Sequence, residues 1–246
     1  MFPLKDDVPT RSLPLITVTL IAANLVVYAY EFTLWPPGLP TRAAAAAARA
    51  FEGFLFEFGL IPCRLGEVCP ARLSTQLAGA PAPWMTVFTS MFVHGGLLHV
   101  GGNMLYLWIF GNNVEDAMGK GRFLGFYLIC GVAAAVAQYL SDPLSSVPMV
   151  GASGAVSGTL GAYLLLHPRA HVWTLVGFGW YWRLVPIPAM VVLGFWIIVQ
   201  LVSSAVTFGR ADGGGVAFLA HVGGFVAGLA LVSLFRQQPR TSYRRH

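Results

Sequence analysis

Long apolar segments separated by short polar loops restrict the fold of this chain more than any other feature of its sequence. The first apolar run extends from Leu13 to Tyr30, and others fill most of the second half of the chain. A helix rises about 1.5 Å per residue, so runs of this length match the hydrocarbon thickness of a bilayer. A helix also satisfies its backbone hydrogen bonds internally, as a segment in lipid must. We therefore expect membrane-spanning helices.

The composition supports an integral membrane protein. Of the 246 residues, 56% are hydrophobic and only 10% are charged, and the mean hydropathy is +0.67. A soluble domain of this size could not bury so much apolar surface. The apolar runs do not alternate with polar residues, so we expect no strand-forming segments and exclude a membrane β-barrel. The pI of 9.4 does not indicate a nucleic-acid partner, because the basic residues are scattered over short loops and the C-terminal tail.

We expect a single all-α membrane domain over residues 1–246, with a polar N-terminus at 1–12, a six-helix core at 13–235 and a basic tail at 236–246. The expected helices are Leu13–Tyr30, Leu97–Asp116, Arg122–Leu140, Gly151–Leu166, Leu184–Val206 and Val216–Phe235. The first run could instead be a signal peptide. It is long for one, however, and no convincing cleavage site precedes Glu31.

The segment between Trp35 and Trp84 differs from these runs. Three prolines break it near its start, and an alanine run then leads into several phenylalanines interspersed with charged residues. This mixture suits the membrane interface, so we expect a large first loop lying on one leaflet. Cys63 and Cys69 share this loop, where a disulfide between them is allowed but not required, and Cys130 lies in an apolar run. The three cysteines do not have the spacing of a zinc site.

Six spans place both termini on the same side of the membrane. If that side is the cytoplasm, ten of the fifteen basic residues lie inside, as the positive-inside rule favours. The inside residues are Lys5, Arg11, Lys120, Arg122, Arg169, Arg183, Arg236, Arg240, Arg244 and Arg245, and the outside residues are Arg42, Arg49, Arg64, Arg72 and Arg210. We therefore expect a multi-pass protein of the bacterial inner membrane with cytoplasmic termini.

A short motif, Gly151-Ala152-Ser153-Gly154, opens the fourth expected helix. It places a hydroxyl at the mouth of an apolar helix, between glycines that allow close approach of backbone or substrate. Ser153 is therefore a candidate nucleophile. A second interpretation stays open, because Gly154, Gly158 and Gly161 also form the small-residue face with which membrane helices pack together.

Other polar side chains are expected at the same depth. With the expected topology the second, fourth and sixth helices all run inward, so Ser153 and His221 lie roughly 5 to 10 Å below the outer surface. His99 and Asn103 are four residues apart and share one face of the second helix, just after His94. Each could instead be an interhelical hydrogen-bonding group or, for His221, an ordinary core histidine.

Serine catalysis requires several groups in one place, whereas helix packing does not. A serine nucleophile needs a base to take its proton and donors that stabilise the oxyanion. His221 could supply the base, and His99, Asn103 and the Ser153 backbone N–H could supply the donors. No metal or cofactor is required. Asp142 and Asp212 lie in outer loops, but nothing in the sequence directs either toward His221.

Three motifs together resemble those of the rhomboid intramembrane serine proteases: His94-x4-His99-x3-Asn103, Gly151-Ala152-Ser153-Gly154 and Ala220-His221-x2-Gly224-x3-Gly228. The order of the motifs, the six spans and the long first loop all agree with a rhomboid-like bundle. The resemblance implies a water-filled cavity open to the outside and substrates that are single-span membrane proteins.

The resemblance also implies roles for individual residues. Ser153 would be the nucleophile and His221 the general base of a dyad, and His99 and Asn103 would form the oxyanion site. His94 would be structural, as would Glu115. Gly224 and Gly228 would allow the sixth helix to pack against the fourth, near Gly151 and Gly154. The stretch Thr207–Gly215 would be a cap over the site.

The chain departs from the family pattern at two places. Ser157 stands where some relatives have a tyrosine that stacks on the histidine, and the first loop lacks the Trp-Arg pair of some relatives. The first departure leaves the orientation of His221 open.

Intramembrane proteolysis is the leading hypothesis, with transmembrane proteins and lipid as partners, no nucleic acid, and an oligomeric state that the sequence does not give. The main alternative is an inactive rhomboid-like protein that binds transmembrane helices for quality control. A transporter or proton channel would need midplane charges and repeats, which are not visible. No His-Glu-x-x-His motif indicates a zinc protease, and no pair of aspartates lies in the apolar runs.

Overall fold

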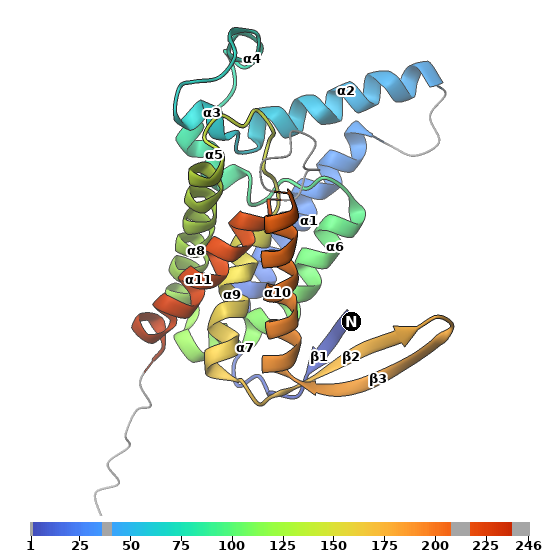
Figure 1. Cartoon of the computed structure of the whole chain (residues 1–246), viewed down its shortest axis with the longest axis vertical. Coiled ribbons are helices and arrows are strands. Elements are labelled where there is room, and N and C mark those ends of the chain that lie inside the picture. Colours follow the sequence, from blue (N-terminus) through green and yellow to red (C-terminus); the bar gives the residue numbers. More distant parts are fainter. Residues whose placement is uncertain (1, 36–40, 208–216, 238–246) are drawn as a thin grey trace, which may run out of the picture.

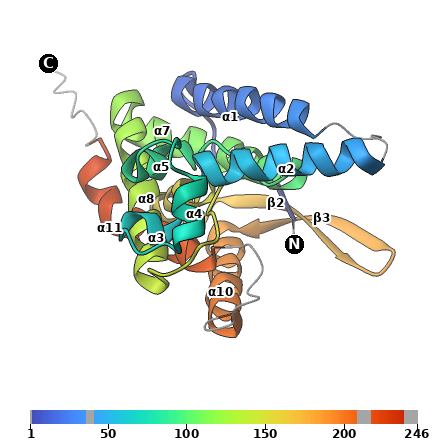
Figure 2. The ribbon, with the colours of Figure 1, turned by 90° about the horizontal axis from the view of Figure 1, so that it is seen from above.

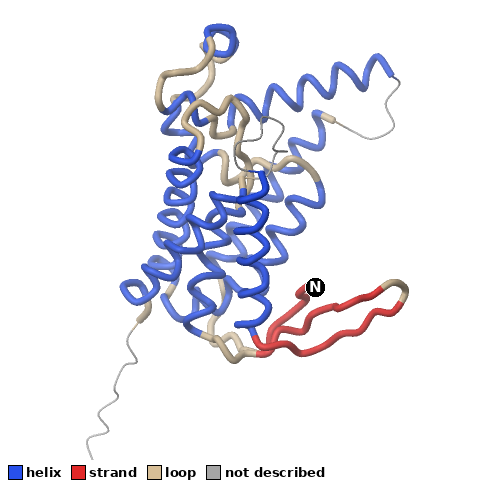
Figure 3. Tube along the Cα trace, in the orientation of Figure 1, coloured by secondary structure: helices blue, strands red, loops and turns tan. Residues whose placement is uncertain are grey.

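The computed structural model describes residues 2–35, 41–207 and 217–237, and it forms a helical bundle with a small sheet at one end (Figure 1). The tube in Figure 3 separates the helical body from the three strands. The expected helical membrane bundle is therefore confirmed.

Five helical segments form the body of the bundle along with a sixth, composite rod. The single helices are α1 (Leu15–Leu34), α8 (Lys120–Ser141), α9 (Ser153–Leu166), α10 (Ala189–Thr207) and α11 (Phe218–Phe235). The composite rod is α6 (Leu97–Tyr106), a π-helical turn η1 (Leu107–Gly111) and α7 (Asn112–Met118). Among the described residues, α1, α8, α10 and α11 are long and apolar enough to cross a membrane. That all six segments cross the bilayer stays a prediction.

The small sheet corrects the expectation that no segment forms strands. Strands β1 (Phe2–Asp6), β2 (His171–Phe178) and β3 (Tyr181–Pro188) pair antiparallel in the order β1-β2-β3. β2 is rich in β-branched and aromatic residues, and a two-residue loop with Gly179 at a φ of 59° joins it to β3. Figures 1 and 2 show this hairpin extending sideways from one end of the bundle.

The hairpin also corrects the start of the fifth expected helix. Leu184 was expected to begin that helix, but it belongs to β3, and α10 begins at Ala189. Pro186 and Pro188 explain the difference, because a proline inside a helix removes a backbone hydrogen bond and the residue before it is biased toward extended backbone.

The first loop is more ordered than its composition suggested. It contains α2 (Thr41–Phe58), α3 (Pro62–Leu65), α4 (Ala71–Gln76) and α5 (Pro83–Thr89), and Cys63 and Cys69 form a disulfide. Ring contacts join Tyr30 of α1 to Phe54 of α2, with centroids 5.5 Å apart. Figure 1 shows α2 running across the end of the bundle that lies opposite the sheet. Its placement on a leaflet stays a prediction.

Helix α9 is the buried centre of the bundle. Every residue from Ala155 to Tyr163 is buried, as expected for a short helix that is apolar on all sides.

The carboxylate of Glu115 in α7 accepts hydrogen bonds from the backbone N–H of Ile16 and Thr17 and from the Thr17 hydroxyl. A carboxylate at these unpaired N–H groups stabilises the start of α1.

A second carboxylate holds the sheet against the bundle. Asp6 Oδ2 of β1 accepts hydrogen bonds from Asn113 Nδ2 of α7 at 2.6 Å and from the Tyr163 hydroxyl of α9 at 2.5 Å. Burial raises the pKa of Asp6, and the hydrogen bond from Tyr163 only partly offsets this effect. Asp6 therefore contributes as an acceptor, while its charge is a cost.

Substitutions of Asp6 can separate these two contributions. Asp6→Ala should destabilise the protein by about 1–3 kcal/mol, because it leaves the buried donors of Tyr163 and Asn113 unpaired. Asp6→Asn keeps an acceptor and removes the charge, so it should match or exceed the wild-type stability. Because the pKa of Asp6 is raised in the fold, this advantage of Asn should grow as the pH rises from the ordinary carboxyl pKa to the raised one, and it should stay constant at higher pH.

Thermal unfolding in detergent at several pH values measures both variants beside the wild type. Equal destabilisation by Asn and Ala would show that the structure needs the charge rather than the acceptor.

Candidate active site

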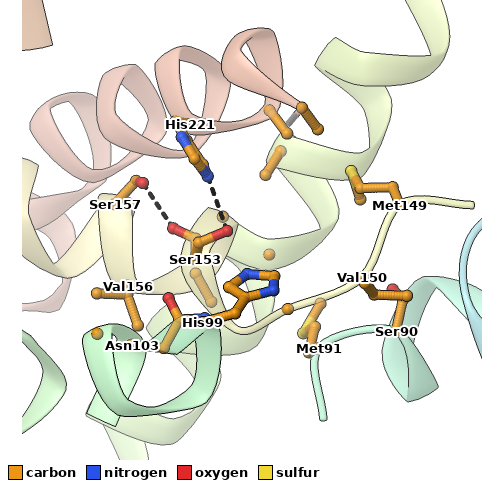
Figure 4. A pocket seen from close by; sticks show the side chains of 18 of the residues that line it. Ser90, Met91, His99, Asn103, Met149, Val150, Ser153, Val156, Ser157 and His221 are labelled. Atoms are coloured by element: carbon orange, nitrogen blue, oxygen red, sulfur yellow. Dashed lines mark hydrogen bonds between the residues drawn. The ribbon is translucent and has the colours of Figure 1, made fainter. Parts of the chain in front are cut away.

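Ser153 and His221 meet in the structure, although 68 positions separate them in the sequence. The Ser153 hydroxyl lies 2.8 Å from His221 Nε2 (Figure 4). Ser153 is the first residue of α9, following Gly151 at a φ of 114°, and His221 lies in the first turn of α11. The structure therefore brings together the two residues that the sequence analysis paired, while their depth in a membrane stays a prediction.

Close packing of glycine backbones makes this contact feasible. A Cβ atom on Gly224 would lie 2.0 Å from the Gly154 carbonyl oxygen, and one on Gly228 would lie 2.0 Å from that of Gly158. α9 and α11 thus touch through their backbones, which any larger residue would prevent. The small-residue face proposed as an alternative is real, and it exists together with the serine–histidine contact.

A third side chain contacts His221, and the sequence analysis missed it. Gln200 Oε1 of α10 lies 2.7 Å from His221 Nδ1, and the Trp196 ring lies 6.0 Å from the imidazole, centroid to centroid. A signal existed: Gln200 is a lone amide inside the apolar helix α10. An amide is costly in lipid unless it faces a polar partner.

Ser157 does not take over the role of the tyrosine found in some relatives. Its hydroxyl donates to the Ser153 backbone carbonyl at 2.6 Å, within α9 (Figure 4). Among the described residues, the rings of Trp196 of α10 and Phe218 of α11 lie beside His221. The rings beside the imidazole therefore come from α10 and α11, whereas the tyrosine of some relatives would come from α9.

Two nitrogen donors from α6 lie on the other side of Ser153. Asn103 Nδ2 is buried and has no hydrogen-bond partner among the described residues. His99 Nδ1 accepts from the Gly95 N–H, so the ring proton resides on Nε2. A Cβ on Gly151 would come within 2.6 Å of His99 Nε2 and 3.4 Å of Asn103 Nδ2. Both donors therefore point at the start of α9, where the Ser153 N–H is also unpaired by the helix.

His94 braces the chain just before Ser153. Its Nδ1 lies 3.2 Å from the Phe92 carbonyl and donates to it, which leaves Nε2 to accept from the Ala152 N–H at 3.4 Å. Glu31 of α1 accepts from the His94 backbone N–H at 2.9 Å. Glu31 is a second residue that the sequence analysis did not assign to the site.

A cavity of about 480 Å³ lies beside Ser153. Ser153, His221, His99 and Asn103 all border it, and Trp196 forms part of its wall. The expected cap over the site, at 207–215, lies almost wholly outside the described residues. In the described part of the chain no group of three or more His, Cys, Asp or Glu side chains could hold a metal ion.

The arrangement contains the parts that acyl transfer requires. A hydroxyl contacts an imidazole that can accept its proton, and unpaired N–H donors converge nearby. A cavity beside them leaves room for a substrate.

Comparison with known proteins adds independent findings. A family model described as the rhomboid domain matches residues 81–238. The chain is 40% identical over 85 residues to rhomboid protease GluP of Bacillus subtilis, an alignment that covers 35% of this chain and 16% of that protein. It is 31% identical over 167 residues to the chloroplastic Rhomboid-like protein 11 of Arabidopsis thaliana, an alignment that covers 65% of this chain and 55% of that protein. RHOMBOID-like protein 5 of the same plant is 29% identical over 252 residues, which cover 97% of this chain and 73% of that protein. The first two alignments span less than two thirds of those relatives.

The glycine packing can be tested by one substitution and a matched control. Gly224→Ala places a methyl group against the Gly154 carbonyl and forces α11 away from α9, so we expect a loss of about 1–3 kcal/mol. Gly194→Ala in α10 meets nothing within 4 Å, so it should be neutral or stabilising by up to about 1 kcal/mol. Thermal unfolding in detergent compares the two, and equal effects would argue against backbone contact.

Proposed function

Because the chain belongs to the rhomboid family, we propose that it is an intramembrane serine protease that cleaves peptide bonds in or near transmembrane segments. The observation that carries this proposal is the 2.8 Å contact between the Ser153 hydroxyl and His221 Nε2 at a cavity. If His221 were only a core histidine and Ser153 only a helix-packing residue, nothing would require the two side chains to meet beside unpaired N–H donors.

In the proposed mechanism His221 Nε2 removes the proton from the Ser153 hydroxyl as its oxygen attacks the substrate carbonyl carbon. The oxyanion accepts hydrogen bonds from Asn103 Nδ2, His99 Nε2 and the Ser153 backbone N–H. The imidazolium then gives its proton to the leaving amine, and an acyl-enzyme forms. Water activated by His221 releases the second product and restores Ser153.

The substrates we propose are single-span membrane proteins, reached from within the bilayer. The alternative is a catalytically inactive protein that holds transmembrane helices. The presence of both members of the dyad, within hydrogen-bonding distance, favours the protease.

We also propose cytoplasmic termini and, for a bacterial source, the inner membrane. This orientation rests on the bias of basic residues. The relatives described above come from a bacterium and a plant, so they do not favour one membrane over another.

Cleavage by purified protein tests the proposal directly. Wild-type protein in detergent should cut a single-span reporter, and Ser153→Ala and His221→Ala should each abolish cleavage while leaving the fold intact. The double variant should lose little more, because the two residues act as a unit. Leu234→Ala, at an exposed position of α11 that does not line the cavity, is the control that should cleave normally. Near-normal turnover by either dyad variant would refute the proposal.

Asn103 offers a separate test of the oxyanion site. If its amide stabilises the transition state, Asn103→Ala should lower kcat by roughly 10² to 10³ with little change in KM. Asn103→Asp should be at least as damaging, because a carboxylate would repel the oxyanion.

The competing role for Asn103 is interhelical packing. In that case Asn103→Ala should cost on the order of 1 kcal/mol of stability with kcat preserved. Steady-state kinetics and thermal unfolding on the same preparations distinguish the two, and full kcat in a destabilised variant would remove Asn103 from the site.

A further inference from the structure

The serine–histidine contact uses only one of the two ring nitrogens of His221. To accept the serine proton, Nε2 must have a free lone pair, so the ring must carry its proton on Nδ1. A histidine without a partner at Nδ1 exchanges between both tautomers and can rotate. Whether Nδ1 carries the ring proton therefore decides whether the imidazole can act as a base toward Ser153.

Helix α10 provides the partner for this second nitrogen. Gln200 Oε1 lies 2.7 Å from His221 Nδ1, and Gln200 is only 9% exposed. Trp196 precedes Gln200 by one helical turn, so the two side chains share a face of α10, and the Trp196 ring lies 6.0 Å from the imidazole. His221 is thus held between Ser153 on α9 and two side chains of α10.

Building on the proposed protease function, we propose that Gln200 is a positioning residue for His221. Its amide oxygen accepts the Nδ1–H hydrogen bond, which fixes the tautomer with the Nε2 lone pair directed at Ser153. The same hydrogen bond holds the plane of the ring while the proton moves from the hydroxyl to Nε2 and on to the leaving amine. The site then consists of a serine, a histidine and a glutamine from three different helices.

A neutral acceptor suits this location. A carboxylate at this position would favour the imidazolium and would add a charge inside a membrane-spanning helix, which is costly. The amide fixes the tautomer without a net charge. The other titratable side chains that line the cavity in the described part of the chain are His99 and Tyr106 of α6.

The orientation of the amide is what the proposal asserts, and a substitution can test it. If the amide were reversed, its NH₂ group would donate to Nδ1, and the ring proton would lie on Nε2. A glutamate at position 200 can only accept when ionised, so Gln200→Glu should preserve function if Oε1 faces the ring. Gln200→Met has a similar length but lacks the amide acceptor.

The experiment measures kcat and KM of the full chain in detergent between pH 5.5 and 9, on one single-span reporter. Locking the wrong tautomer costs about 10⁴ in kcat in Ser-His-Asp enzymes. Gln200→Met frees the ring rather than locking it wrongly, so we expect a smaller loss of kcat, about 10- to 100-fold, with KM nearly unchanged. Ile198→Met, on an exposed position of α10, is the matched control and should behave like the wild type.

Gln200→Glu should keep kcat at alkaline pH. Its acidic limb should move upward by about one unit or more, because the carboxylate stabilises the imidazolium. Rates are normalised to the amount of folded enzyme, measured by thermal unfolding, so that a loss of stability alone does not change the reported kcat. Wild-type kcat and pH profile in Gln200→Met would overturn the proposal, as would an unshifted acidic limb in Gln200→Glu.

A readout without turnover separates this inference from the proposed function. In protein labelled with ¹⁵N-histidine, the His221 signals, assigned by their loss in His221→Ala, should show a single tautomer protonated at Nδ1. Gln200→Met should give a mixture. A wild-type protein that cleaves nothing would refute the protease function, whereas a mixed or Nε2-protonated wild-type ring would refute the role of Gln200.

Discussion

The backbone contact between α9 and α11 is the constraint on which the site depends. Gly224 and Gly228 lie against the carbonyl groups of Gly154 and Gly158, with no space for a side chain between them. This spacing brings the first turns of the two helices together and leaves the Ser153 hydroxyl 2.8 Å from His221 Nε2. Packing and catalysis are therefore not alternative explanations of these glycines, because the packing creates the geometry that the proposed serine chemistry needs.

Several polar groups inside the bundle join one segment of the chain to another. Glu31 and His94 hold the segment before Ser153, Glu115 caps the start of α1, and Gln200 reaches His221. Such groups are costly in an apolar surrounding unless they are satisfied. Asn103 Nδ2 is buried without a partner among the described residues, at the place where an oxyanion would form. This is the donor that a substrate could satisfy, which supports its proposed role.

The sequence predicted those parts of the structure that depend on local pattern. Apolar runs indicated the helices, and the fixed spacing of His99 and Asn103 on one helix face put both beside the candidate serine. The second half of the hairpin was missed because Leu184–Pro188 is apolar and was taken as the start of a spanning helix, although Pro186 and Pro188 argue against that. Its first half, β2, was left unassigned between two expected helices. Gln200 and Glu31 were missed for a different reason: each is a single polar residue, and its partner is fixed by tertiary packing rather than by spacing.

The central claim is that His221 activates Ser153, and covalent labelling tests it most directly. Protein in detergent is treated with a fluorophosphonate, digested, and mapped by mass spectrometry. We expect the adduct on the peptide that contains Ser153, and its loss in His221→Ala, because an unactivated hydroxyl reacts slowly. An adduct on a different residue, or unchanged labelling of Ser153 in His221→Ala, would contradict the account.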